Sequence, residues 1–108
     1  MTIREYDGIL FFSDPKLTNR VQEIEGIDKI LSDCTDTYCE ISYSGRDTSR
    51  FVVKLLQSLA SILVDADGEI TCEVDNDGEI SFEFYSIKKA GLYCEAGTIV
   101  RSNIHEVT

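Results

Sequence analysis

Two consecutive ten-residue segments of this chain have nearly the same sequence. Residues 64–73 read VDADGEITCE, and residues 74–83 read VDNDGEISFE. Two copies are too few for a solenoid, in which stacked repeats bury a shared core. In each copy an Asp-Gly dipeptide, which is typical of tight turns, precedes a segment in which apolar and polar residues alternate. The repeat therefore predicts β-strands joined by turns in this part of the chain.

The alternation also predicts how these two strands pair. Their apolar residues can share one face only if Val74 lies opposite Ile80. This register leaves residues 76–78 as a three-residue loop. Such loops favour a left-handed glycine at their last position, where Gly78 stands. The inward-facing side chains are then Ile70, Cys72, Val74, Ile80, Phe82 and Phe84.

A third strand is predicted after the turn-like residues 88–91, and it should run to about Arg101. Its apolar residues Leu92, Cys94 and Ala96 face inward only if Ser86 lies opposite Leu92. The three strands then form an antiparallel meander. Its outer face carries tyrosines and acidic residues in facing positions, with Tyr85 opposite Tyr93 and Glu83 opposite Glu95.

The clearest helix is predicted at residues 51–64. Apolar residues recur there every three or four positions, which makes one wide apolar stripe. Asp47, Thr48 and Ser49 precede this segment, and any of their side chains can accept a hydrogen bond from a free N–H group at the start of the helix. Gly68 lies just beyond the segment, where a left-handed glycine commonly ends a helix.

The N-terminal half allows two interpretations at its start. Residues 3–6 and 9–12 form either a tight hairpin or one irregular strand. A helix is predicted to begin at residues 13–15, where a proline can occupy the first helical turn, and to be interrupted at Gly26. Residues 38–43 alternate and predict another strand, with Cys39, Ile41 and Tyr43 on one face.

At 108 residues the chain is long enough for one domain, residues 1–108, and the predicted elements give it an α+β fold. A central amphipathic helix packs on an antiparallel sheet that ends in the C-terminal three-stranded meander. The first residues lack the apolar region of a signal peptide, and the longest uncharged stretch, residues 55–64, is half as long as a membrane crossing needs. We therefore expect a cytoplasmic protein that does not enter the membrane and keeps its cysteines reduced.

Metal and catalytic sites are weakly indicated. Residues 73–84 resemble a calcium loop, but Phe84 stands where such a loop has a bidentate glutamate, so a hairpin turn is favoured. The cysteines lack zinc-site spacing. The single histidine, His105, is expected in a C-terminal tail, which leaves Ser and Cys nucleophiles without a base. We expect no enzymatic activity, metal or cofactor. Three cysteines fall instead on apolar strand faces and are expected in the core: Cys39, Cys72 and Cys94.

Acidic residues are concentrated in one stretch. The net charge is −10, and residues 65–83 hold eight acidic residues and no basic one. This charge argues against direct binding of nucleic acid. The predicted register places Asp75 opposite Glu79, and facing like charges are destabilising. Together with exposed tyrosines, this favours a site for a basic protein over a merely solubilising surface. The candidate partner-binding residues are Asp65, Asp67, Glu69, Glu73, Asp75, Asp77, Glu79, Glu83, Tyr85, Tyr93 and Glu95.

The predicted helix is followed by DGEITCEVDNDG, then by FEFY at residues 82–85 and LY at residues 92–93. This arrangement, over roughly residues 46–101, resembles small acidic immunity proteins of bacterial polymorphic toxin systems, of which contact-dependent growth inhibition is the best known. The resemblance implies cytosolic residence and neutralisation of one cognate toxin domain, commonly a nuclease with a basic active-site cleft. Another acidic binder, such as a phage-encoded inhibitor that mimics nucleic acid, is the alternative, and a small acid–base enzyme is a third.

Overall fold

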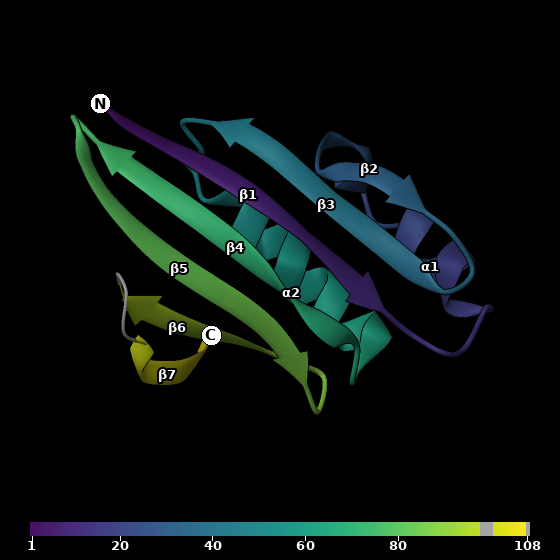
Figure 1. Cartoon of the computed structure of the whole chain (residues 1–108). Helices are drawn as coiled ribbons and strands as arrows, with labels where there is room; N and C mark the ends of the chain where they lie inside the picture. The colour runs from purple at the N-terminus through teal and green to yellow at the C-terminus, as the bar shows by residue number, and fades with distance from the viewer. Residues whose placement is uncertain (98–100, 108) are drawn as a thin grey trace.

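The protein has the predicted α+β fold, with a central helix packed on an antiparallel sheet (Figure 1). The structure is a computed structural model that describes residues 1–97 and 101–107. In chain order its elements are β1 (Thr2–Phe11), α1 (Leu17–Gln22), the 3₁₀ turn η1 (Ile27–Lys29), β2 (Leu31–Cys34), β3 (Tyr38–Gly45), α2 (Phe51–Leu63), β4 (Asp67–Asn76), β5 (Glu79–Lys88), β6 (Gly91–Gly97) and β7 (Arg101–Val107).

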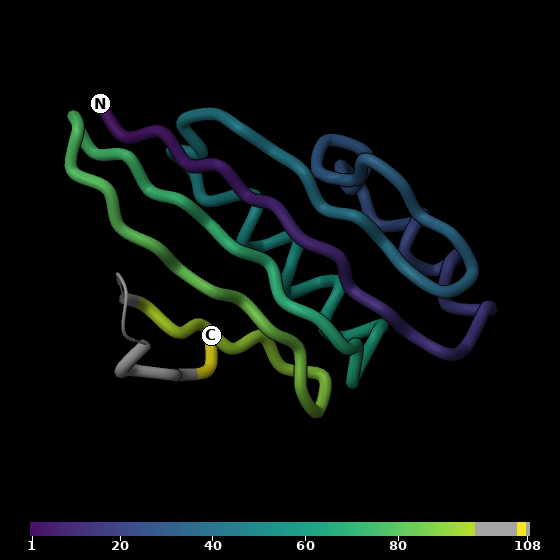
Figure 2. Tube along the Cα trace, viewed as in Figure 1, coloured from purple at the N-terminus to yellow at the C-terminus, as the bar shows by residue number. Residues whose placement is uncertain are grey.

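The described strands form one sheet in the order β2-β3-β1-β4-β5-β6-β7, and every neighbouring pair is antiparallel. The strand that comes first in the chain therefore lies inside the sheet. Because β3 and β4 are both antiparallel to β1, they run parallel to each other with β1 between them. Helix α2 connects β3 to β4 and crosses behind β1, as the trace in Figure 2 shows. From β4 onward the sheet is a meander of neighbouring strands, one strand longer than predicted.

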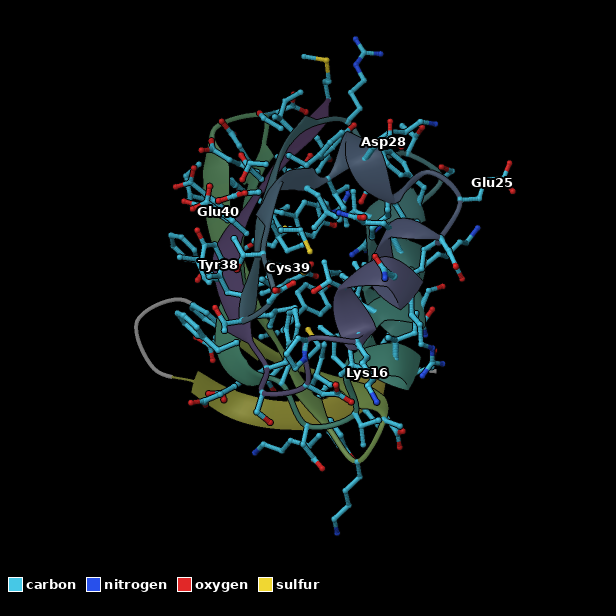
Figure 3. All side chains as sticks on the ribbon, turned by 90° about the vertical axis from the view of Figure 1, so that its right-hand side faces the viewer. Lys16, Glu25, Asp28, Tyr38, Cys39 and Glu40 are labelled. Carbon is cyan, nitrogen blue, oxygen red and sulfur yellow. The ribbon has the colours of Figure 1, made fainter. Side chains whose placement is uncertain are left out.

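All helices of the described chain lie on one face of the sheet. Seen edge-on in Figure 3, the helices cover the right-hand face and leave the left-hand face bare. Helix α2 places five fully or nearly fully buried side chains against the sheet, and its apolar stripe is thus the centre of the core. None of these helices is long and apolar enough to cross a membrane. The buried residues of α2 are Val52, Leu56, Leu59, Ala60 and Leu63.

In the N-terminal half, the second of the two interpretations is right. Residues 2–11 form one strand rather than a hairpin, because β1 pairs along its length with both β3 and β4. The predicted helix is short and stops before Gly26, which has a left-handed φ of 84°. Strand β3 is confirmed, with Cys39 and Ile41 in the core. The sequence pattern did not reveal β2, which is only four residues long.

The C-terminal end differs from the prediction. The third strand of the meander, β6, ends at Gly97 rather than near Arg101, and residues 98–100 of that prediction lie outside the described residues. Arg101 begins a further strand, β7, which returns along β6. The backbone of His105 is therefore part of the sheet opposite Cys94, and the expected C-terminal tail is wrong.

The predicted pairing of β4 with β5 is wrong by one residue. Val74 lies opposite Ser81, and Asn76 opposite Glu79, so the turn has two residues rather than three. Asp77 and Gly78 have φ values of 53° and 94°, and two successive positive φ angles are typical of a two-residue hairpin turn of type I′. Because side chains alternate along a strand, a shift of one residue sends every side chain of β5 to the other face.

The turn from β5 to β6 is shifted in the same way. Ile87, not Ser86, lies opposite Leu92, and the two turn residues Lys89 and Ala90 both have positive φ. The end of α2 holds this turn in place. The Lys89 N–H donates to Asp65 Oδ1 at 2.9 Å, and the Ala90 N–H donates to the carbonyl oxygen of residue 64 at 2.8 Å.

Gly68 does not end the helix as predicted. Helix α2 stops at Leu63, and Val64 takes the positive φ of 59° that turns the chain. Gly68 lies within β4, where a Cβ atom would be 2.1 Å from the carbonyl oxygen of Ile9. Glycine is thus needed there because β1 passes so close. At the other end of the helix Asp47 accepts a hydrogen bond from the free Val52 N–H, at 3.3 Å, which agrees with its predicted capping role.

Candidate partner-binding face

The face of the sheet that no described helix covers is called the open face below. Figure 3 shows the alternation that defines it: Tyr38 and Glu40 point away from the helices, while Cys39 between them points toward the helices. The register extends this assignment from β3 across the sheet. The acidic residues on the open face are Glu5, Asp7, Asp33, Glu40, Asp67, Glu69, Glu73, Asp75, Glu95 and Glu106, whereas Lys88 is the basic one among the described side chains.

Acidic side chains crowd together where β1 meets β4. Glu5 lies directly opposite Glu73, and Asp7 lies opposite Thr71. These four residues line a shallow hollow of about 270 Å³, which we call the acidic notch. Within the described residues, no ion pair or hydrogen bond neutralises the carboxylates of Glu5, Asp7 or Glu73. Facing like charges oppose strand pairing, so the notch costs the fold stability.

An aromatic strip borders the acidic notch on β5. The rings of Phe82 and Phe84 stack with centroids 6.1 Å apart and planes inclined by 16°. Phe82 lies opposite Glu73, while Phe84 has Thr71 on one side and Glu95 on the other. Both rings are partly exposed. Carboxylates therefore flank two aromatic faces, an arrangement that suits a guanidinium or ammonium group through ion pairing and cation–π contact.

The one-residue shift decides which predicted site residues reach this face. Tyr93 is on the open face as expected, but opposite Ser86 instead of Tyr85, and Asp75 lies opposite Ile80 instead of Glu79. Glu95 lies opposite Phe84 and not opposite Glu83. The predicted residues that the open face does carry are Asp67, Glu69, Glu73, Asp75, Tyr93 and Glu95.

Three predicted residues lie on the opposite, helix-covered side. Glu79 and Glu83 share a face of β5 with Tyr85, which is only 3% exposed and belongs to the core. The prediction that they lie on the outer acidic face was wrong, because the two-residue turn shifts β5 by one residue and sends these side chains to the other face. Two further acids serve local contacts: Asp65 binds the β5–β6 turn, and Asp77 pairs with the amino group of Met1.

Tyr85 and Glu83 belong instead to a polar cluster between α2 and the sheet, which we call the arginine cluster. Arg50 Nη2 donates to Glu83 Oε1 at 3.3 Å and to Tyr85 Oη at 3.1 Å, and Tyr85 Oη donates to the same Glu83 oxygen at 2.9 Å. Tyr6 Oη donates to Asp47 Oδ2 at 2.8 Å, and Arg50 Nε lies 3.7 Å from that oxygen. The cluster therefore ties the start of α2 to strands β1 and β5.

Burial shapes the chemistry of this cluster. Removal from water raises the pKa of Tyr6 and of Tyr85 above the ordinary value, and their carboxylate acceptors Asp47 and Glu83 raise it further. Both phenols consequently stay protonated and act as donors. Arg50 Nε makes no hydrogen bond, but it lies within ion-pair distance of Asp47 Oδ2. These contacts indicate a structural role.

No family model, curated protein or solved structure matches this chain. The chemistry of the open face is therefore the basis for a function. Among the described residues, no group of three or more histidine, cysteine, aspartate or glutamate side chains is arranged to hold a metal ion. The calcium-like segment forms the favoured hairpin, in which Asp75 Oδ1 accepts the Gly78 N–H at 2.8 Å.

Several residues of the open face were missed by the sequence reasoning. Glu5 and Asp7 stand in a strand whose partner could not be read from the sequence, because β1 meets β4 across some seventy residues of chain. Phe82 and Phe84 were assigned to the core. The signal that places them outside was present in the dipeptide Asp77-Gly78, since Asp-Gly favours a two-residue turn.

Proposed function

We propose that this protein is an immunity protein, which binds and neutralises a basic toxin domain through the open face of its sheet. The observation that carries the proposal is the pairing of Glu5 with Glu73 beside the Phe82–Phe84 strip. Facing carboxylates with no counter-ion among the described residues weaken the folded protein, and the stacked phenylalanines beside them stay partly exposed. Features that oppose folding in this way are expected at functional sites.

The acidic notch and the aromatic strip suit the same kind of partner side chain. A lysine or arginine placed between Glu5 and Glu73 would relieve their repulsion and gain charge-assisted hydrogen bonds. A guanidinium over Phe82 or Phe84 would at the same time lie beside Glu73 or Glu95. The aromatic strip supplies the apolar centre and the acidic residues supply the charged surroundings, which is the usual anatomy of a protein interface.

Charge on this face also favours rapid capture of a toxin. A surface with acidic residues on every strand except β5, and with little basic charge among its described side chains, attracts a positive partner over a distance set by the ionic strength. The active-site cleft of a nuclease carries lysine and arginine residues for the phosphate backbone, so it offers the complementary field. Covering that cleft blocks substrate and requires no catalysis by the immunity protein.

The proposal is tested by survival of bacteria that express the toxin. The toxin domain to test is the C-terminal domain of a large secreted protein, where the gene preceding the one for this chain encodes such a protein. Co-expression with the wild-type chain should protect the cells. The triple variant Glu5→Gln/Asp7→Asn/Glu73→Gln should lose protection, and its association rate with the purified toxin domain should depend less steeply on salt.

A matched control removes the same charge from the helix-covered side. Glu23, Glu25 and Asp28 are exposed near α1 and η1, and Figure 3 shows Glu25 and Asp28 on the side away from the open face. The variant Glu23→Gln/Glu25→Gln/Asp28→Asn should protect as well as the wild type. Equal protection by both triple variants would mean that the open face only keeps the protein in solution.

A further inference from the structure

Cys34 and Cys39 lie directly opposite each other on the edge strands β2 and β3. The Thr35 N–H donates to the carbonyl oxygen of Tyr38 at 2.8 Å. A hydrogen bond between the residues just inside a facing pair identifies the pair as the non-hydrogen-bonded kind. In such pairs the Cα atoms are about 4.5 Å apart and the side chains approach each other most closely.

This spacing falls within the range that a disulfide spans. Cα atoms of bridged cysteines are usually about 4.4–6.8 Å apart. The other two cysteines offer a contrast: Cys72 on β4 and Cys94 on β6 have the whole of β5 between them, so their strands are about 9–10 Å apart.

The two facing thiols differ in access to solvent. Cys39 is fully buried, and removal from water together with the neighbouring Cys34 thiol raises its pKa. Cys34 is partly exposed and lines a hollow of about 280 Å³ together with Gln22, Ser32 and Asp33. A small oxidant can therefore reach Cys34 while Cys39 stays protected behind it.

We propose that Cys34 and Cys39 are a site of reversible oxidation, at which hydrogen peroxide converts the facing thiols into a disulfide between β2 and β3. The Cys34 sulfur attacks one peroxide oxygen, the O–O bond breaks, and water leaves after protonation, so that Cys34 becomes a sulfenic acid. The Cys39 sulfur then attacks the Cys34 sulfur. The S–O bond breaks, the S–S bond forms, and a second water carries away the hydroxyl group and the Cys39 proton. This site is independent of the proposed toxin binding.

The experiment counts thiols in the 108-residue chain. The folded, reduced chain is treated with hydrogen peroxide, quenched and denatured, and its remaining thiols are labelled with a maleimide and counted by intact mass. We expect four labels before oxidation and two after it. Proteolytic mapping should find one linked peptide pair that joins Cys34 to Cys39, and dithiothreitol should restore four labels.

Two variants make the count specific. Cys34→Ser should keep three thiols under the same treatment, because Cys39 alone is buried. Cys94→Ala keeps the facing pair and should fall from three thiols to one. Melting curves establish that both variants are folded. Four surviving thiols in the wild type, a linkage between two chains, or oxidation of Cys34 to a sulfinic acid without linkage would each overturn the proposal.

The melting temperature supplies a second readout. A disulfide that closes on the native geometry restrains the unfolded chain without straining the folded one. The oxidised protein should therefore melt several degrees above the reduced protein, and the difference should vanish with dithiothreitol and in Cys34→Ser. A linked protein that melts lower than the reduced one would show that the pair closes only by distorting the sheet edge, contrary to the proposal.

Discussion

Two pairs of acidic residues, one on each face of this sheet, differ in the partners of their carboxylates. On the helix-covered face Glu83 and Asp47 accept hydrogen bonds from tyrosines and lie beside Arg50. On the open face Glu5 and Glu73 face each other, with no ion pair among the described residues. Glu83 and Asp47 thus contribute to stability, whereas Glu5 and Glu73 detract from it. These two facing carboxylates therefore need an explanation outside folding.

The strongest test of the covered face removes Asp47. Asp47→Ala leaves the Tyr6 hydroxyl and the Val52 N–H without their acceptor and takes away the nearest carboxylate to Arg50 Nε. Removing one partner from a buried charged network typically costs about 4 kcal/mol. Urea unfolding should show this loss. Asp47→Asn keeps an acceptor and tolerates the positive φ of 46°, so it should cost less than half as much.

Alkaline pH should weaken the same face. The raised pKa values of Tyr6 and Tyr85 mean that the folded protein keeps protons which the unfolded chain loses above its tyrosine pKa of 10.0. The stability they provide is complete below pH 10 and is lost as the pH rises further. For each of these two tyrosines, the free energy of unfolding should be about 1.4 kcal/mol lower at pH 11 than well below pH 10. The free energy of unfolding should fall by about 2.5 kcal/mol between pH 9.5 and pH 11 because of these two tyrosines.

Tyr85→Phe is the control for this pH dependence. It removes one titrating group and should leave about half of the tyrosine-dependent loss between pH 9.5 and 11. Three cysteines, Cys39, Cys72 and Cys94, add to the loss at lower pH, because burial raises the pKa of each thiol above its ordinary value of 9.0. A free energy of unfolding that stays constant up to pH 11 would contradict the assignment of these groups to a dry interior.

On the open face, the aromatic strip should matter more for binding than for folding. Phe82→Ala should weaken binding to the toxin domain by about 2 kcal/mol, mainly through faster dissociation. Phe11→Ala removes a phenylalanine that is 49% exposed at the opposite end of the same face, beside Tyr38, and should change binding little. Surface plasmon resonance separates the two rates. An equal loss of affinity in both variants would contradict this prediction, because it would mean that the binding energy is distributed over the whole open face.

The smallest predicted changes are in stability, and they have opposite signs on the two faces of the sheet. Glu83→Gln weakens the contacts with Arg50 and Tyr85 and should destabilise the protein by about 1 kcal/mol. Glu73→Gln relieves the repulsion with Glu5 and should stabilise it by about 0.5 kcal/mol. Both changes remove one charge from neighbouring strands. Chemical denaturation of the two variants should therefore give shifts in opposite directions.

Local pattern was sufficient for much of the fold. The apolar stripe of residues 51–64 predicted α2 to within one residue of its end, and the alternation at residues 38–43 gave β3 with its inward face. Each of these elements buries one continuous set of apolar side chains, so its apolar pattern is compatible with only one type of element and one buried face. The edge strand β2 was not predictable in this way, since four residues with a register irregularity carry no clear period.

The face of β5 was misassigned because both of its faces carry large apolar residues. Ile80, Phe82 and Phe84 look more apolar than the alternative set that includes Tyr85 and Ile87. The core contains Tyr85 and Ile87 instead, because the two-residue turn fixes the register of β5 and because Tyr85 forms hydrogen bonds in the arginine cluster. Half of the candidate site, the part on β4 and β6, was unaffected. The contribution of β1 depends on long-range pairing, which no local pattern encodes.

The position of β1 inside the sheet has a consequence for how the chain reaches its native state. β1 is the first strand of this chain, yet one of its neighbours, β4, ends at Asn76. During synthesis one backbone edge of β1 stays unpaired until β4, which ends at Asn76, has left the ribosome, and such distant pairings also slow folding. Glu5 and Asp7 would protect the waiting strand from aggregation in this interval, as charged residues do when they interrupt a strand-forming segment.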